Sequence, residues 1–266
     1  MTRYASLALA LCAAALAACD KNGRQDITAP AVGAYVKFSN FSVGSPGVNF
    51  YANSAKITAV GSTACQPPND TTSVCKTTGT ESTTGTAYNG FGNAALYNDI
   101  TPGQVTLAGK IAAATDNGLA VATVSTTLDN AKYYSYYMSG VYDATNKKAD
   151  AFVIEDDFPA TIDYTVTYVR FVNAISNSSP MTLYAKSSVT GTESAIGGST
   201  AYKAATAFVA IPPAVYDLNT RNTGSTTNVI TRTAVSFVAG HVYTITARGI
   251  IGSTTSAPAL DNTANR

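Results

Sequence analysis

YVKFSN at residues 35–40 returns as YVRFVN at residues 168–173, and these two stretches decide the fold. In the first of them Val36 and Phe38 alternate with polar residues, and the second repeats this pattern. A period of two is typical of a β-strand that buries one of its faces. Both stretches are therefore predicted to be half-buried strands at equivalent places of a repeated domain.

Further motifs recur downstream of both strands in the same order. They are FYA at 50–52 and LYA at 183–185, TGTES at 78–82 and at 190–194, TAY at 86–88 and at 200–202, ITPG at 100–103 and IPPA at 211–214, and KYYS at 132–135 and HVYT at 241–244. Self-similarity in a fixed order indicates a duplication. We predict a first domain over residues 33–160 and a second over residues 161–262.

Short alternating stretches, separated by turns rich in Gly, Pro, Asn and Ser, run through both domains. No segment after residue 19 has a helical apolar period with caps. Many short strands in domains of about a hundred residues indicate a sandwich. The predicted fold class is all-β, with two tandem immunoglobulin-like antiparallel β-sandwiches.

The N-terminus has the layout of a bacterial lipoprotein signal peptide over residues 1–19. Arg3 supplies a positive start, residues 7–16 form an apolar run too short to span a bilayer, and small residues lead into Cys19. We expect cleavage before Cys19, lipid modification of that cysteine, and a flexible tether over residues 20–32. The protein is then held in the cell envelope, at the outer membrane, the periplasmic face of the inner membrane or the cell surface.

The charge of the chain excludes one class of partner. Only 12% of the residues are charged, and the formal net charge is +1. Such a chain has no field that attracts a phosphate backbone, so we expect no nucleic-acid partner. We also expect no cofactor and no metal site.

Two cysteines remain after the signal peptide and the lipid-modified cysteine are set aside. Cys65 and Cys75 form an even pair in an exported chain, which favours a disulfide, whereas metal binding needs more ligands. Both lie in an insertion of the first domain, predicted at about residues 56–77. The loop that the disulfide closes contains Pro67, Asn69 and Asp70. It is either a stapled surface loop or a recognition loop that binds a partner.

The tyrosines indicate two kinds of role. Tyr134 and Tyr243 hold matching positions in the two domains and resemble the tyrosine corner of immunoglobulin-like sandwiches, so we assign them a structural role. Tyr133 and Tyr137 are expected on the face opposite to Tyr134. They form an exposed strip on which glycan rings stack, or they cover the neighbouring domain, or they make ordinary cross-strand pairs.

Catalysis finds little support in the sequence. His241 is the sole histidine and matches Lys132 of the first domain, and neither a G-x-S-x-G motif nor a phosphate-binding loop occurs. The acidic run at residues 155–157 lacks the alternating ligands and the glycine of a calcium loop, so we interpret it as an acidic linker. We therefore expect that the protein is not an enzyme.

Several motifs together resemble those of a known family. They are VRFVN at 169–173 with Pro180 after it, its looser copy at 36–40, the turn Pro102-Gly103, and the acidic close FVIEDD at 152–157. This set is similar to the bacterial domain-of-unknown-function 4397 family, over nearly all of residues 33–262. The resemblance implies exported, lipid-anchored domains in tandem and no catalytic residues. The second domain departs from the pattern at Ala214 and Asp261.

From the sequence we expect a lipid-anchored, non-enzymatic protein of the cell envelope that binds or scaffolds through its tandem domains. Its partner is then an envelope protein or a cell-surface polysaccharide. The alternative is a carbohydrate-binding module of an uptake or adhesion system, and a third possibility is a spacer.

Overall fold

The computed structural model describes residues 33–58 and 84–265. Gly33–Arg266 forms one compact unit that contains both predicted domains. The predicted signal peptide and tether (1–32, with Cys19) lie outside the described residues, as do Cys65, Cys75, Pro67, Asn69 and Asp70.

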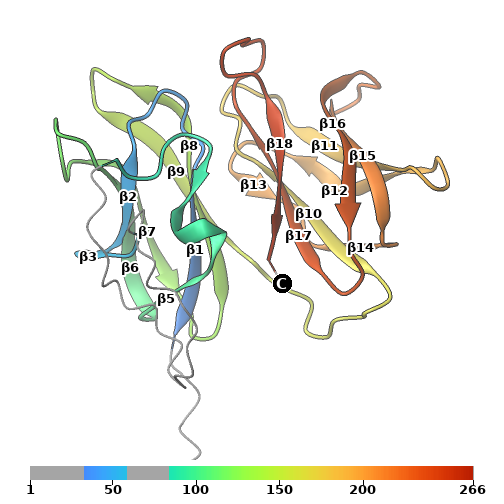
Figure 1. Ribbon diagram of the computed structural model, residues 1–266, viewed down its shortest axis with the longest axis horizontal. Helices are drawn as coiled ribbons and strands as arrows, with labels where there is room; N and C mark the ends of the chain where they lie inside the picture. The colour runs from blue at the N-terminus through green and yellow to red at the C-terminus, as the bar shows by residue number, and fades with distance from the viewer. Residues whose placement is uncertain (1–32, 59–83, 266) are drawn as a thin grey trace, which may run out of the picture. The chain divides into compact units, whose positions relative to one another are not determined.

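The first domain consists of two sheets (Figure 1). Its strands in the described residues are β1 (Ala34–Asn40), β2 (Val48–Ala52), β3 (Ala55–Lys56), β4 (Gly90–Phe91), β5 (Asn98–Ile100), β6 (Gly103–Ile111), β7 (Ala120–Leu128), β8 (Tyr133–Asp143) and β9 (Lys148–Glu155). One sheet has the order β4-β1-β8-β9, with β5 also paired to β1, and the other has the order β3-β2-β6-β7. A short 3₁₀ helix, Gly92–Ala95, lies between β4 and β5.

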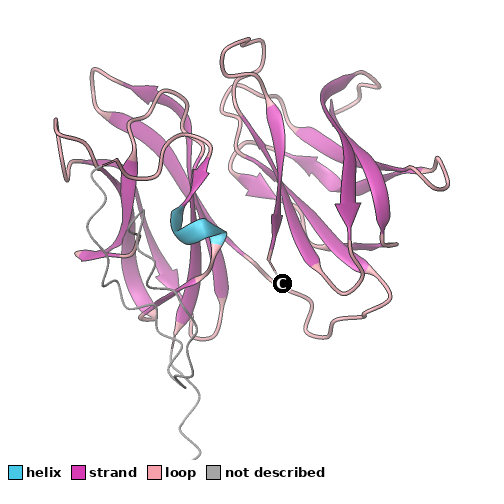
Figure 2. Ribbon diagram, viewed as in Figure 1, coloured by secondary structure: helices cyan, strands magenta, loops and turns pink. Residues whose placement is uncertain are grey.

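The second domain repeats this arrangement strand for strand. Its strands are β10 (Thr167–Asn173), β11 (Met181–Ser187), β12 (Glu193–Thr200), β13 (Ala204–Ala205), β14 (Val209–Ile211), β15 (Ala214–Asn222), β16 (Asn228–Phe237), β17 (Val242–Arg248) and β18 (Ala259–Ala264). The sheet orders are β13-β10-β17-β18, with β14 on β10, and β12-β11-β15-β16. The predicted duplication is therefore visible as two similar pairs of sheets, built of strands and loops (Figure 2).

Each domain contains one parallel pair of strands, so the prediction of purely antiparallel sandwiches is wrong at that point. β1 pairs with β8 in parallel, and β10 pairs with β17 in parallel. Parallel neighbours need a long crossover connection. The chain supplies it because six strands of the described residues come between β1 and β8: β2, β3, β6 and β7 of the other sheet, and β4 and β5, which pair with β1 on its other edge.

The apolar positions of the two opening strands face the cores, as predicted. Val36 and Phe38 are fully buried in the core of the first domain, where Phe38 stacks on Phe50 with ring centroids 5.1 Å apart. Val169 and Phe171 are fully buried in the core of the second. Burial of such side chains contributes about 1.5–3 kcal/mol each.

Strand pairing in the described residues bears on where the insertion of the first domain begins. Ala52 pairs with Ala55 in the first domain, at the position where Ala185 pairs with Ser194 in the second. Ala55 thus holds the register position of Ser194, the last residue of TGTES in the second domain, and residues 78–82 lie outside the described residues. Val48 then pairs with Thr86 as Met181 pairs with Thr200. Lys56, at the start of the predicted insertion, belongs to β3.

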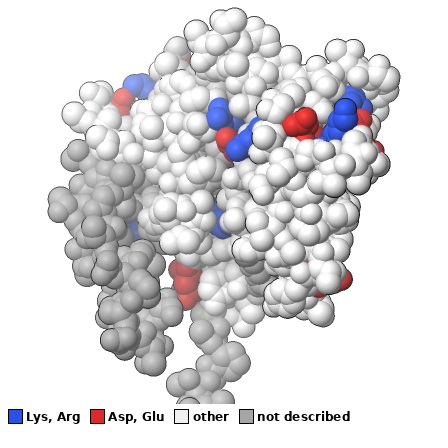
Figure 3. All heavy atoms as spheres, turned by 45° about the vertical axis from the view of Figure 1, so that its right-hand side comes forward, with Lys and Arg blue, Asp and Glu red and all other residues white. Residues whose placement is uncertain are grey.

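Charges are sparse on the surface. On the face drawn in Figure 3 most atoms belong to uncharged residues. Arg221 pairs with Glu193 at 2.7 Å, and Lys132 pairs with Glu155 at 2.7 Å. A search of the described residues for a helix both long and apolar enough to cross a membrane finds none.

Candidate functional site

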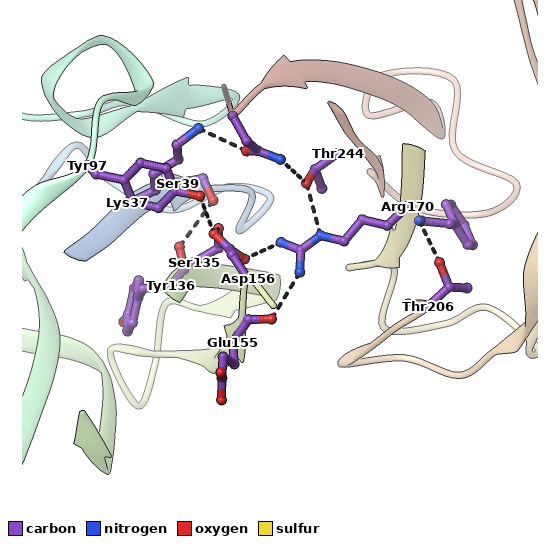
Figure 4. A network of polar contacts seen from close by, with 12 residues as sticks. Lys37, Ser39, Tyr97, Ser135, Tyr136, Glu155, Asp156, Arg170, Thr206 and Thr244 are labelled. Atoms are coloured by element: carbon purple, nitrogen blue, oxygen red, sulfur yellow. Dashed lines mark hydrogen bonds and ion pairs between the residues drawn. The ribbon is translucent and has the colours of Figure 1, made fainter. Parts of the chain in front are cut away.

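Arg170 is the largest fully buried side chain of the described residues, with 1% of its surface exposed. Arg170 belongs to β10 of the second domain. Its guanidinium forms an ion pair with Asp156, which directly follows β9 of the first domain (Figure 4). Its Nη1 donates to the carbonyl of Glu155 at 3.1 Å, and its Nε donates to Oγ1 of Thr244 at 3.0 Å. The guanidinium also lies over the ring of Phe208, 4.8 Å from its centroid. One side chain therefore joins the two domains.

Asp156 is 2% exposed, and both oxygens of its carboxylate accept hydrogen bonds. One oxygen accepts from Arg170, and the other accepts from the hydroxyls of Ser135 at 2.7 Å and Tyr97 at 2.5 Å. Its backbone N–H donates to the carbonyl of Tyr133 at 2.7 Å, which fixes the chain just after β9. A buried charge needs such a set of partners, because each missing one leaves an uncompensated desolvation cost.

Lys37 makes a contact in the reverse direction. It belongs to β1 of the first domain and crosses to the C-terminal end of the second domain. Its Nζ donates to the carbonyl of Ala264 at 3.0 Å and to Oδ1 of Asn265 at 2.9 Å. The ammonium lies over the ring of Tyr97, 4.4 Å from the centroid. Asn265 is held in turn because its Nδ2 donates to Oγ1 of Thr244 at 2.8 Å.

These two crossings are related by the duplication. The equivalent pairs are Lys37 and Arg170 in β1 and β10, Ser135 and Thr244 in β8 and β17, Tyr97 and Phe208 just before β5 and β14, and Asp156 and Asn265 just after β9 and β18. In each crossing a cation lies over an aromatic ring of its own domain and donates to a carbonyl and a side-chain oxygen of the other. Such reciprocity is the signature of an isologous interface. We call this set of residues the joint.

A second pair of equivalent contacts flanks the joint. Tyr202 of the second domain makes a 2.8 Å hydrogen bond with Ser139 of β8 and donates to Asp150 at 2.9 Å. Its counterpart Tyr88 lies 3.4 Å from Nη1 of Arg248, the residue of β17 that matches Ser139. The TAY motif found by its repetition thus lies between the domains.

Apolar packing next to the joint is unequal between the domains. Phe41, Tyr137 and Phe152 of the first domain cluster with Val172 and Ala174 of the second. The first domain supplies the large rings, and the second supplies the small side chains that admit them.

Burial and charge shape the ionisation of the joint. Burial lowers the pKa of Lys37 to about 8, with Asp156 opposing the shift and Arg170 adding to it. Burial alone disfavours the charged guanidinium of Arg170, but Asp156 outweighs it and the pKa of Arg170 is raised. The pKa of Tyr97 is raised by burial and by the neighbouring carboxylate of Asp156. The joint therefore holds charge between the two domains, with Arg170 paired to Asp156 and Lys37 bonded to the neutral oxygens of Ala264 and Asn265.

Of the alternatives that the sequence left open for Tyr133 and Tyr137, an exposed tyrosine strip does not fit the burial of these side chains. Tyr137 is only 4% exposed, because its ring stacks on Phe152 at 4.9 Å within the cluster beside the joint. Tyr133 is half-buried and stacks on Tyr35 at 4.8 Å. Both rings make cross-strand pairs, and Tyr137 also covers the neighbouring domain, at Val172 and Ala174.

The two predicted corner tyrosines have the expected hydrogen bonds. The hydroxyl of Tyr134 accepts from the backbone N–H of Asp129 at 3.1 Å. The hydroxyl of Tyr243 accepts from the N–H of Val238 at 3.2 Å. In both domains a tyrosine ties its strand to the loop just before it.

The acidic run at residues 155–157 is more than the linker that the sequence suggested. Glu155 and Asp157 are exposed, but Asp156 is buried in the joint. The missed signal is that a basic residue occupies the same strand position in both domains, at Lys37 and Arg170. Within the described residues, no group of three or more His, Cys, Asp or Glu side chains is arranged to hold a metal ion.

Comparison with known proteins identifies the second domain. Residues 167–266 match the family described as "Domain of unknown function (DUF4397)", so this part of the chain is a DUF4397 domain. No curated protein matches the chain. Among solved structures, the Bacillus anthracis TIE protein is similar to 83% of this chain, with 10% identity and a TM-score of 0.25. The match covers 34% of that protein, so the present chain spans about a third of its length.

Proposed function

We propose that the chain is a lipid-anchored, non-enzymatic protein of the cell envelope, which binds or scaffolds partners with two immunoglobulin-like sandwiches held as one body. The joint is the observation that carries this proposal. A fixed relation between two domains is what a scaffold or a two-domain binding surface needs, because it removes the entropy of a flexible connection before a partner binds.

The chemistry of the joint also favours a mechanical role. Its ion pair, Arg170 with Asp156, is buried and its hydrogen bonds are made. Buried networks that are fully satisfied add rigidity and specify one arrangement. An envelope protein or a cell-surface polysaccharide is the proposed partner.

Membrane attachment is proposed through a lipid on Cys19, and the finer classification of the sandwiches as immunoglobulin-like belongs to the same proposal. The tyrosine corners at Tyr134 and Tyr243 support that classification. The alternative, a carbohydrate-binding module of an uptake or adhesion system, loses the aromatic strip that favoured it, because Tyr137 is buried.

The anchor is tested by fractionation of cells that express the full chain. Cys19→Ala should move the protein from the membrane fraction to the soluble fraction. Cys12→Ala, which changes the other cysteine of the signal region, should leave it in the membrane fraction. Retention of the Cys19→Ala protein in the membrane fraction would contradict the lipid anchor.

The one-body arrangement is tested by distances between spin labels in the two domains. Labels at Thr123 in β7 and Thr233 in β16, both exposed, are introduced into a chain whose native cysteines are replaced by serine. We expect a single narrow distance distribution that broadens when Asp156→Asn breaks the ion pair. A broad distribution in the parent chain would refute the rigid scaffold.

A further inference from the structure

A hollow of about 360 Å³ opens at one end of the second sandwich. It lies between the hairpin that joins β11 to β12 and the turn that joins β14 to β15. Its lining includes Ala185, Ser187, Val189, Ser194, Ile211 and Tyr216. This volume falls within the range of small-molecule sites, which is about 300–1,000 Å³.

The hollow exists because the side chains at this end of the sandwich are too small to fill the space between the two sheets. Ala185 and Ser194 are paired across β11 and β12, and Ser187 lies two residues further along β11. The next inward pair, Leu183 and Ile196, is large and fully buried. The small side chains of Ala185, Ser187 and Ser194 therefore leave a gap at the end of the packed core that is open to a small molecule.

An exposed apolar side chain belongs to the lining. Val189, at the tip of the hairpin, is 80% exposed. The hairpin tip is held beside β15 because the N–H of Ser188 donates to the carbonyl of Val215 at 2.9 Å. Exposed apolar groups beside a concavity are characteristic of ligand-binding surfaces.

The polar groups of the lining are hydroxyls, and none of the lining residues is charged. Ser187 accepts at its Oγ from the N–H groups of Val189 at 3.2 Å and Thr190 at 3.3 Å, so these bonds hold the hairpin and leave the serine proton for another acceptor. The hydroxyl of Tyr216 donates to the carbonyl of Pro212 at 2.7 Å. The deep wall is thus apolar, and hydrogen bonding is concentrated on the hairpin side.

We propose that this hollow binds one compact neutral amphiphile, that is, an apolar ring or branched chain bearing a hydroxyl or carbonyl group. The apolar body lies against Ile211 and Tyr216, and the polar group faces Ser187 and Ser194. A charged ligand is disfavoured because the lining offers no countercharge to offset its desolvation. This site is separate from the joint and goes beyond the proposed scaffold role without depending on it.

The test uses saturation-transfer NMR and titrations on the full mature chain with four probes. Phenol and cyclohexanol represent the proposed ligand, benzoate adds a negative charge, and glucose has hydroxyls without an apolar body. We expect phenol and cyclohexanol to bind at least five-fold more tightly than benzoate and glucose. Tighter binding of benzoate or glucose, or no binding of phenol and cyclohexanol, would overturn the proposal.

Variants place the binding in the hollow. Ser194→Leu fills the cavity from an exposed position and should weaken phenol binding at least five-fold, whereas Thr123→Leu, an exposed strand position of the first domain, should not change it. Val189→Lys puts a cation at the exposed rim and should weaken phenol while strengthening benzoate several-fold. Because Val189 is on the surface, this second variant decides the question even if Ser194→Leu impairs folding. Unchanged affinities in both variants would show that the probes bind elsewhere.

Discussion

The two halves of the joint share a backbone arrangement and differ in charge. Arg170 meets the carboxylate of Asp156, whereas Lys37 meets the neutral amide of Asn265 at the equivalent place. The cation of one half, Arg170, is therefore paired with a negative charge. The cation of the other half, Lys37, is bonded to a neutral acceptor. The lowered pKa of Lys37 and the raised pKa of Arg170 follow from this difference in the partner together with burial.

The largest effect is expected from removing the buried carboxylate of Asp156. Asp156→Asn replaces the carboxylate with a neutral amide, so that both halves of the joint have a neutral acceptor. Arg170 is then buried without a countercharge. We expect a loss of about 3–5 kcal/mol in the free energy of unfolding, measured by urea denaturation at pH 7. Asp157→Asn, which changes the exposed neighbour, should cost less than about 0.5 kcal/mol. Equal effects of the two variants would mean that the ion pair does not stabilise the fold.

The half with the neutral acceptor should make stability depend on alkaline pH. Lys37 has a pKa of about 8 in the folded protein against an ordinary value of 10.5, so between these values the unfolded chain holds a proton that the folded one has released. Stability therefore rises with pH across this window, by about 3 kcal/mol in total, and is unaffected by this group below it. Urea denaturation at several pH values measures the rise, and Lys37→Met should remove it. If the variant and the parent have the same pH profile, Lys37 does not titrate in this range.

The sequence predicted which residues of β1 and β10 face the cores, but it did not predict that the residues on the opposite face are buried as well. Alternation in β1 and β10 correctly assigned Val36 and Phe171 to the cores, because a period of two identifies the apolar face of a strand. It cannot say what covers the other face. Lys37 and Arg170 look like solvent-facing residues on that pattern, and only the contact between domains makes them buried.

Short motifs identify equivalent residues where strand pairing agrees with them. The repeated TAY motif is equivalent in both domains, and its tyrosines Tyr88 and Tyr202 both reach the other domain. For the repeated TGTES motif the first copy lies outside the described residues, and Ala55 holds the register position of Ser194. Register depends on which residues pair across strands, and that is not contained in a five-residue match.

Giving the Lys37 half a carboxylate would make the two halves alike. Asn265→Asp should raise the pKa of Lys37 toward its ordinary value and stabilise the protein by about 1–2 kcal/mol at pH 7, since a hydrogen bond between charged partners is stronger than one to a neutral amide. The same urea series should then show a smaller rise between pH 8 and 10.5. Asp261→Asn, which alters an acid of the same strand that pairs with Arg248, serves as a control that should not flatten the profile. A destabilised Asn265→Asp protein with an unchanged profile would show that the new carboxylate does not reach Lys37.

The smallest effect is expected at the aromatic ring beneath each cation. Tyr97 and Phe208 are equivalent, and they differ by the hydroxyl that Tyr97 donates to Asp156. Tyr97→Phe keeps the ring under Lys37 and removes one of three donors to the carboxylate, so we expect a loss of about 1 kcal/mol in urea denaturation. Tyr164→Phe, at a residue 79% exposed, should have no measurable effect. A loss as large as that of Asp156→Asn would mean that the hydroxyl, rather than the guanidinium of Arg170, is what holds the carboxylate in place.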